Sequence, residues 1–270
     1  MSVEKEAVLI LLTVLSIGLL PSGQQTLEGE AILVRTADWL VEHQNPNGTY
    51  TLNMTLENGE YQDAIALGCA AVILLEVYHI TGDQSYLRCA NNTLSLLAEW
   101  QNYNGGWSGH TFFTAEGTYY PLVAFSKYQL YTGDERYDVN IRMAARRLIY
   151  IVGRRYVEYP YVFELGEHIY AMLLAWMATG EDDYKAAADL WVETLVGEFD
   201  HDAGAWNTML DGSGPQGMWD AAIPCLPLLV WDYPELRAQA EQALSWASSL
   251  EVAQGGYTAS HPDGDIVIKA

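Results

Sequence analysis

The segment from Ser95 to Tyr137 decides the fold, and its centre reads Trp100-Gln101-Asn102-Tyr103-Asn104-Gly105-Gly106-Trp107. A stretch with apolar residues at helical spacing ends at Trp100. A second such stretch, Tyr119 to Tyr131, is closed by Thr132-Gly133-Asp134. Apolar residues every three or four positions are typical of helices, and a glycine after such a run is a typical helix end. The segment therefore predicts helices separated by one long and one short connection.

The same two connections recur along the chain at steps on the order of 50 residues, which indicates a repeated supersecondary unit. The short connection is a glycine that follows Thr and precedes an acid, at Gly82, Gly133 and Gly180. The long connection contains a glycine followed closely by an aromatic residue. It occurs as Gly48-Thr49-Tyr50, Gly105-Gly106-Trp107, Gly204-Ala205-Trp206 and Gly255-Gly256-Tyr257. Two helices fit between successive marks, so each repeat is a helical hairpin.

The predicted fold class is therefore all-α, with antiparallel helical hairpins in a partial or closed α/α toroid. The predicted helices are 30–44, then the pairs 62–80 with 84–101, 118–131 with 135–152, 165–179 with 182–198, and 217–231 with 235–250. Segment 254–270 contains Ile266-Val267-Ile268 and is predicted to be a short strand or a tail. Alternating short and long connections place all long loops at one end, where sites tend to lie on a rigid scaffold.

Composition limits the partners. The formal net charge is −22, with 13 Lys and Arg against 35 Asp and Glu. Such a chain repels nucleic acid and anionic membranes, so neither is expected as a partner. The three cysteines, Cys69, Cys89 and Cys225, have no disulfide or zinc spacing and are predicted to be buried thiols. No metal and no cofactor are predicted.

The N-terminal segment differs in kind from the rest. Ala7 to Leu20 is almost wholly apolar and is followed by Pro21-Ser22-Gly23. Its length is that of a signal-peptide core, although it would also suit an additional core helix. We expect residues 1–23 to be a signal peptide or membrane anchor and 24–270 to be the toroid domain. The protein would then be secreted or membrane-anchored and extracytoplasmic, with membrane contact only through this segment. Asn-x-Ser/Thr sequons at Asn47, Asn53 and Asn91 agree with export.

Two family resemblances follow from these motifs. Trp39-Leu40-x-x-x-Gln44-x-x-x-Gly48-x-Tyr50 and Leu97-x-x-x-Gln101-x-x-x-Gly105-x-Trp107 resemble the QW motif of terpenoid cyclases and prenyltransferases. In that motif Gln caps a helix end and the aromatic residue packs against the next hairpin, which concerns the fold rather than the chemistry. The acid motif Asp-x-Asp-Asp of the cyclases does not occur in the sequence.

The second resemblance covers residues 114–206. Thr132-Gly133-Asp134, Glu158-Tyr159-Pro160 and the following helix with Tyr170 are similar to the helical domain of glucuronyl C5-epimerases and related polysaccharide-active toroids. It implies that Tyr159 and nearby acids serve catalysis. Epimerisation or β-elimination at a uronic acid removes the proton beside a carboxylate, which needs a base and a group that holds the developing negative charge.

The candidate residues lie at the starts of the inner helices and in the loops that lead to them. The candidate catalytic residues are Tyr159, His168, Glu164, Glu167, Asp63 and Asp220. The candidate substrate-binding residues are Trp107, Tyr120, Arg154, Arg155, Trp206 and Trp219. Simpler roles compete with these assignments: acids in a first helical turn act as caps, cations stabilise a helix C-terminus, and aromatic residues pack between repeats.

Three functions remain open at this point. The first is an exported carbohydrate-active enzyme, a uronate epimerase, lyase or glycoside hydrolase, whose partner is a polysaccharide or other small-molecule ligand. The second is a non-catalytic surface toroid that binds a glycan or a protein. The third is a terpenoid cyclase- or prenyltransferase-like protein, which would need a deep apolar cavity.

Overall fold

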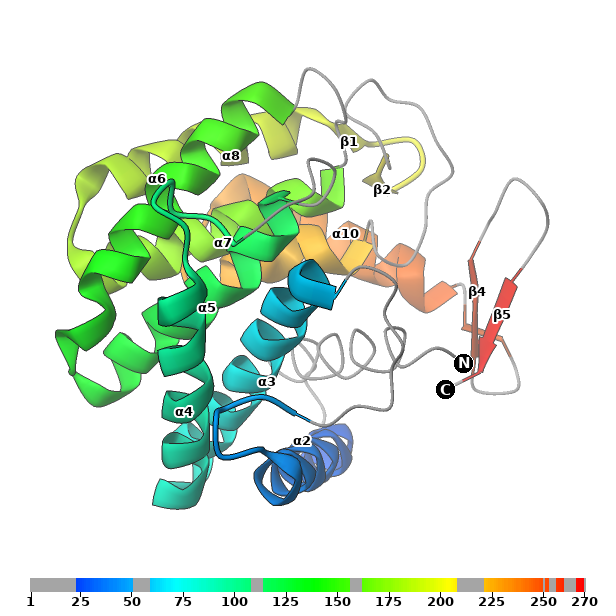
Figure 1. Ribbon diagram of the computed structural model, residues 1–270. Helices are drawn as coiled ribbons and strands as arrows, with labels where there is room; N and C mark the ends of the chain where they lie inside the picture. Colours follow the sequence, from blue (N-terminus) through cyan, green and yellow to red (C-terminus); the bar gives the residue numbers. More distant parts are fainter. Residues whose placement is uncertain are drawn as a thin grey trace. The chain divides into compact units, whose positions relative to one another are not determined.

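The computed structural model describes the backbone of residues 23–50, 59–107, 114–155, 162–207 and 221–249, together with three short strands near the C-terminus (Figure 1). Side chains are described for 29–50, 64–107, 117–153, 162, 164–207 and 221–246. The N-terminal segment 1–22 lies outside the described residues, so its predicted export role stays a prediction. Two compact units are recognised, one formed by 1–151 with 174–181 and the other by 152–173 with 182–270.

The first unit contains the helices α2 (Gly23–His43), α3 (Gly59–Thr81), α4 (Gln84–Trp100) and α5 (Thr114–Thr132), the 3₁₀ helix η1 (Glu135–Tyr137) and most of α6 (Asp138–Arg155). Helix α3 packs against α2, α4 and α5. Its stretch Ala64–Thr81 is long and apolar enough to cross a membrane, with mean hydropathy 1.9, but 61% of it is buried inside the fold. We therefore interpret α3 as the core helix of this unit.

Close packing between α3 and α5 depends on Gly68. A Cβ atom at this position would lie 2.8 Å from the backbone nitrogen of Pro121, a distance that real Cβ atoms do not reach. Only glycine therefore allows the two helices to approach this closely. The contact also fixes the neighbouring residue Tyr120, which is a candidate substrate-binding residue.

The second unit contains the start of α7 (Val162–Thr179), α8 (Asp182–Gly197), the 3₁₀ helix η2 (Ile223–Leu229) and α10 (Pro234–Ser249). Strands β1 (Phe199–Asp200) and β2 (Ala205–Trp206) form a small antiparallel hairpin after α8. Strands β3 (Glu251–Val252), β4 (Gly256–Ala259) and β5 (Ile266–Lys269) form a three-stranded antiparallel sheet.

Both predicted connections have a repeated structure. Gly82, Gly133 and Gly180 have φ of 73°, 70° and 71°. Each donates its N–H to the carbonyl four residues earlier, as in a left-handed helix cap. In the long loops, Asn45 donates to the Thr49 carbonyl and Asn102 donates equivalently to the Gly106 carbonyl, both at 2.8 Å. The punctuation in the sequence thus marks real structural repeats.

The predicted all-α hairpin fold is confirmed, with differences at its ends. The first helix begins at Gly23 rather than near 30. The α-helix predicted for 217–231 is wrong over its second half, where η2 occupies Ile223–Leu229. Pro224 and Pro227 explain this difference, because proline has no backbone N–H for an interior α-helical hydrogen bond. The C-terminal segment forms strands β4 and β5 rather than a tail.

Candidate active site

The candidate active site is at the start of α7, where Glu164, Glu167 and His168 lie within two helical turns. Their side chains are 2%, 7% and 1% exposed. Residues three and four positions apart share a helix face, so both carboxyl groups and the imidazole lie on one side of α7. Charged groups are almost never buried unless they interact with other groups, and all three of these residues have interaction partners.

The opposite side of α7 is fixed by Gly166. A Cβ atom there would lie 2.6 Å from the carbonyl oxygen of Ile223 and 2.7 Å from Cα of Pro224. Helix α7 therefore rests directly on the backbone of η2. On the candidate-site side, the His168 ring contacts Trp191 of α8 edge-on, with ring centroids 6.4 Å apart and an interplanar angle of 65°. Backbone contact on one side and an aromatic contact on the other hold the imidazole in place.

This arrangement is suited to proton transfer. A buried carboxyl group and an imidazole can each act as a general acid or base, and burial favours their neutral forms. Two carboxyl groups on the same helix face also provide the residue types that a glycoside hydrolase requires. Among the described residues, no group of His, Cys, Asp and Glu has the geometry of a metal site.

The other predicted catalytic residues lie partly or wholly outside the described residues. Asp63 belongs to α3, but only its backbone is described. Tyr159 and Asp220 lie outside the described residues altogether. Their catalytic roles therefore stay predictions.

Three of the predicted substrate-binding residues also lie partly or wholly outside the described residues. Arg154 and Arg155 form the end of α6 with side chains outside the described set, and Trp219 lies outside the described residues. Tyr120 is described: it lies on α5, is 8% exposed and contacts Tyr119 edge-on at 4.7 Å between ring centroids.

Two predicted sugar-contacting residues are packing residues. Trp107 is 3% exposed and Trp206 is 0% exposed. The indole N–H of Trp107 donates to the Leu97 carbonyl at 2.6 Å, and that of Trp206 donates to the Leu195 carbonyl at 2.9 Å. A buried indole presents no ring face to a sugar. Both residues instead anchor a long loop to the end of the preceding helix, and we leave them out of the proposed site.

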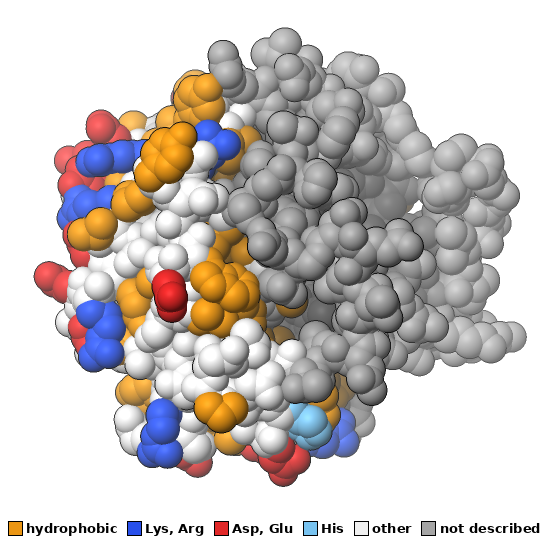
Figure 2. Space-filling model, in the orientation of Figure 1, with side chains coloured by type: hydrophobic (Ala, Val, Ile, Leu, Met, Phe, Trp, Pro, Cys, Tyr) orange, Lys and Arg blue, Asp and Glu red, His pale blue; other side chains and the backbone are white. Residues whose placement is uncertain are grey.

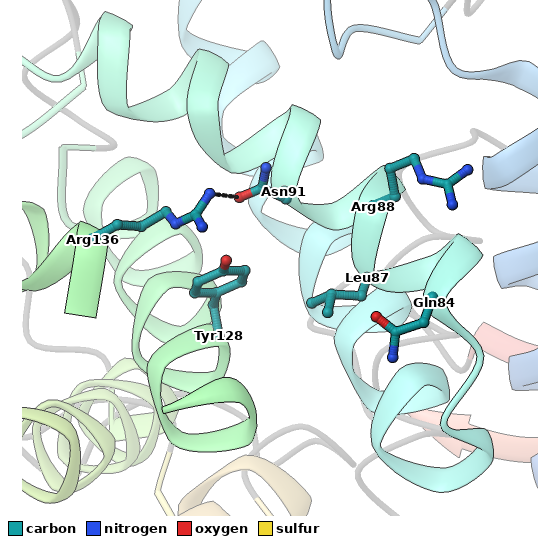
Figure 3. A pocket seen from close by; sticks show the side chains of 6 residues that line it. All are labelled: Gln84, Leu87, Arg88, Asn91, Tyr128 and Arg136. Atoms are coloured by element: carbon teal, nitrogen blue, oxygen red, sulfur yellow. Dashed lines mark hydrogen bonds between the residues drawn. The ribbon is translucent and has the colours of Figure 1, made fainter. Parts of the chain in front are cut away.

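One feature was missed by the sequence reasoning. A pocket of about 220 Å³ in the first unit is lined by Gln84, Leu87, Arg88, Asn91, Tyr128 and Arg136 (Figure 3). Four of these residues have the spacing of one helix face on α4, at 84, 87, 88 and 91. That spacing, together with two basic residues in an acidic chain, is the signal that would have found it.

Comparison with known proteins supports the fold class and leaves the activity open. No protein-family model and no curated protein matches the sequence. Among solved structures, a sugar epimerase from a ruminal bacterium is similar with TM-score 0.63 and 12% identity, over 87% of this chain and 74% of that one. A glycoside hydrolase of family 88 from Bacteroides vulgatus gives TM-score 0.58 and 11% identity, over 87% of this chain and 72% of that one.

A third similar structure is a β-arabinofuranosidase of glycoside hydrolase family 127, with TM-score 0.60 and 14% identity. The match covers 94% of this chain but only 46% of that enzyme. Identities this low show the fold alone. The chain thus has the α/α-toroid fold found in carbohydrate-active enzymes. The narrower resemblances to glucuronyl C5-epimerases and to terpenoid cyclases stay predictions.

Proposed function

We propose that this protein is a carbohydrate-active enzyme that transfers a proton on a uronate-containing polysaccharide, as an epimerase or a lyase. The observation that carries the proposal is the buried cluster of Glu164, Glu167 and His168 on one face at the start of α7. Its support is the fold, which this chain shares with a sugar epimerase and glycoside hydrolases.

The chemistry requires a base to remove the proton next to the uronate carboxylate. His168 and Tyr159 are the proposed proton carriers, and a protonated Glu164 or Glu167 is the proposed donor to the developing enolate. An ionised Glu would repel the substrate carboxylate, so the proposed donor has to be protonated when the substrate binds; both side chains are buried. Arg154 and Arg155 are proposed to neutralise the substrate carboxylate.

A glycoside hydrolase is the second candidate. It is favoured by one observation, the presence of two buried carboxyl groups one helical turn apart, Glu164 and Glu167. A hydrolase uses one as acid and the other as base or nucleophile. In that case a neutral polysaccharide would serve as substrate at least as well as an acidic one.

Incubation of the purified protein with uronate and neutral polysaccharides in deuterated water separates these reactions. An epimerase incorporates deuterium at the uronate carbon next to the carboxylate, a lyase produces an unsaturated uronate, and a hydrolase produces new reducing ends without deuterium. We expect deuterium or unsaturation with uronate substrates. New reducing ends from neutral polysaccharides alone would favour the hydrolase instead, and binding without turnover would identify a non-catalytic glycan-binding protein.

The variants Glu164→Gln and His168→Gln test the site itself. Each should lower turnover by about 100-fold or more, which is the usual contribution of general acid–base catalysis. Glu193→Gln is the matched control, because Glu193 is exposed on the neighbouring helix α8. Circular dichroism must show that the buried variants remain folded. Full activity in both folded variants would contradict the assignment of this cluster.

Export is proposed separately, on the composition of residues 1–23. Deletion of these residues should leave a soluble, folded domain, because a signal core contributes nothing to the toroid. Loss of the helical signal in circular dichroism after the deletion would show that Ala7 to Leu20 belongs to the core.

A further inference from the structure

The pocket in the first unit lies between α4, the C-terminal part of α5 and η1, and we refer to it as the α4–α5 pocket (Figure 3). It is formed at the end of α5 that is closed by the short Gly133 turn, whereas the candidate active site is at the start of α7. Its residues all belong to the first unit, and those of the candidate active site belong to the second.

The chemistry of the pocket lining is unusual for this chain. Two of its six lining residues are arginines, Arg88 and Arg136, and none is an acid. The whole chain has only 13 basic residues against 35 acidic ones. On the described face shown in Figure 2, basic side chains mostly lie beside acidic ones. Asp134 forms an ion pair with Arg136, so the positive charge available to a ligand in this pocket is that of Arg88, which suits a ligand with negative charge.

The polar wall of the pocket is held in position by its own contacts. Asp134 accepts a hydrogen bond from Arg136 Nε at 2.7 Å, and Arg136 in turn donates to Asn91 Oδ1 at 3.4 Å. The Tyr137 hydroxyl also donates to Asn91 Oδ1, at 3.0 Å. A guanidinium has five N–H donors, so Arg136 retains donors for a ligand. Such preorganisation lowers the entropy cost of binding.

Arg88 supplies a positive charge that none of the described ion pairs neutralises. None of the ion pairs found among the described residues includes Arg88, and its side chain is exposed. Asp83 influences it only at longer range, and that carboxylate already accepts a hydrogen bond from the Ser85 backbone as a helix cap. A guanidinium of this kind can form a charge-assisted hydrogen bond with a carboxylate.

The remaining lining residues suit a small ring. In Figure 3 the Leu87 side chain points toward the Tyr128 ring, and Gln84 adds an amide at the edge. At about 220 Å³ the pocket is smaller than the usual drug-sized site. Tyr128 is only 4% exposed, so the apolar contact with the C–H groups of a sugar would come from Leu87. The neighbouring amide and guanidinium groups can bind the hydroxyl groups of the sugar.

We propose that the α4–α5 pocket is a second saccharide site that binds a single uronic acid residue, with its carboxylate at Arg88. The choice of a sugar ring rests on the proposed carbohydrate function, whereas the need for a carboxylate follows from the pocket alone. The site would bind an acidic polysaccharide through residues other than those of the proposed reacting centre.

The test is binding of D-glucuronate to the full chain, followed by NMR on the Leu87 methyl groups. Glucuronate should shift these resonances, and Arg88→Gln should weaken the binding about tenfold or more, as for a lost hydrogen bond to a charged group. Arg35→Gln is the matched control, because Arg35 is also exposed and lies on α2. Glucose and acetate are the comparison ligands, and both should bind more weakly than glucuronate.

Several results would overturn the proposal. These are unshifted Leu87 methyl groups, equal affinity in Arg88→Gln, or an equal loss in Arg35→Gln. Acetate binding as tightly as glucuronate would show a simple carboxylate site and would refute the sugar assignment. The measurement detects binding and not turnover. Its result can therefore be interpreted even if the catalytic proposal fails.

Discussion

Gln101, the residue that follows α4, and Asn140 of α6 form a two-way hydrogen-bonded contact. Asn140 Nδ2 donates to Gln101 Oε1 at 2.7 Å, and Gln101 Nε2 donates to the Asn140 carbonyl at 3.1 Å. The preceding repeat uses the same residue types, since Asn92 Nδ2 donates to Gln44 Oε1 at 3.1 Å. The glutamine of the repeated motif therefore joins one hairpin to the next rather than capping only its own helix.

This contact predicts an energetic coupling between the two residues. Gln101→Ala should lower the free energy of unfolding by about 1–3 kcal/mol, because it leaves partly buried polar groups unsatisfied. In a double-mutant cycle with Asn140→Ala, the coupling should be about 0.5 kcal/mol or more. Urea unfolding measures both values, and Gln84→Ala, at an exposed position of α4, is the control. Additive effects of the two substitutions would contradict a direct interaction.

Two glycines with similar backbone angles should differ in their tolerance of alanine. Gly105 and Gly133 have φ of 87° and 70°. A Cβ atom on Gly105 would lie 2.1 Å from the Met143 carbonyl oxygen, whereas Gly133 has nothing within 4 Å. Gly133→Ala should therefore lower the free energy of unfolding by only about 1–2 kcal/mol, which is the cost of a left-handed backbone angle for a residue with a Cβ atom. Gly105→Ala should cost clearly more in the same urea experiment, and an equal cost would show that the loop moves freely.

The caps of the short turns should affect stability and leave activity unchanged. Asp83 accepts from the Ser85 backbone N–H, which lowers the pKa of its carboxyl group, and Arg136 likewise lowers the pKa of Asp134. A carboxyl group whose pKa is lower in the folded state stabilises the fold at pH values above its pKa in the unfolded chain, which is about 4. This stabilisation is lost as the pH falls through the pKa of the folded state. Asp83→Ala should therefore lower the melting temperature at pH 7, and the difference from the unmodified protein should shrink in acid.

Tyr131 should make the fold sensitive to alkali. Burial, together with the nearby Glu76 carboxylate, raises the pKa of its hydroxyl group to about 12. A raised pKa means that the folded chain holds this proton more tightly, so the stabilisation is complete below pH of about 10 and is lost as the pH rises toward 12. Tyr131→Phe removes the titration. Its unfolding free energy should fall less steeply between pH 9 and 12 than that of the unmodified chain.

Tyr159→Phe tests the resemblance to the uronate epimerases, although Tyr159 lies outside the described residues. The substitution removes only a hydroxyl group, so the fold should be retained while turnover on uronate substrates is lost. Deuterium incorporation is the measurement, with far-ultraviolet circular dichroism as the check on folding. Full-rate turnover in this variant would contradict the epimerase-like hypothesis, and the acid pair would become the next candidate.

The fold was predictable from the sequence because its repeats are marked locally. A left-handed backbone angle at Gly82 or Gly133 favours glycine whatever surrounds it. The glycine therefore identifies the turn from the sequence, without knowledge of the tertiary structure. The helix at 217–231 was mispredicted for the opposite reason. Apolar residues around Pro224 and Pro227 continue the pattern, but proline has no backbone N–H to donate to an α-helical hydrogen bond.

The candidate site was predictable only where spacing is sufficient. Glu164, Glu167 and His168 share a face because helical geometry alone places them there. Their position in loops predicts ligand contact for Trp107 and Trp206, yet a loop position does not specify which way a side chain turns. Their orientation depends on the Leu97 and Leu195 carbonyls, whose need for a hydrogen-bond donor becomes visible only in three dimensions.

The contact of Gly166 with η2 sets a limit on how the start of α7 can vary in sequence. The backbone of Ile223 and Pro224 leaves no room for even one methyl group at residue 166, so helix α7 is packed directly against η2 at this point. The same contact keeps the start of α7, and with it the buried side chains of Glu164, Glu167 and His168, in one position. We expect proteins that share this helix contact to retain glycine at the position of Gly166, whatever saccharide the proposed site binds.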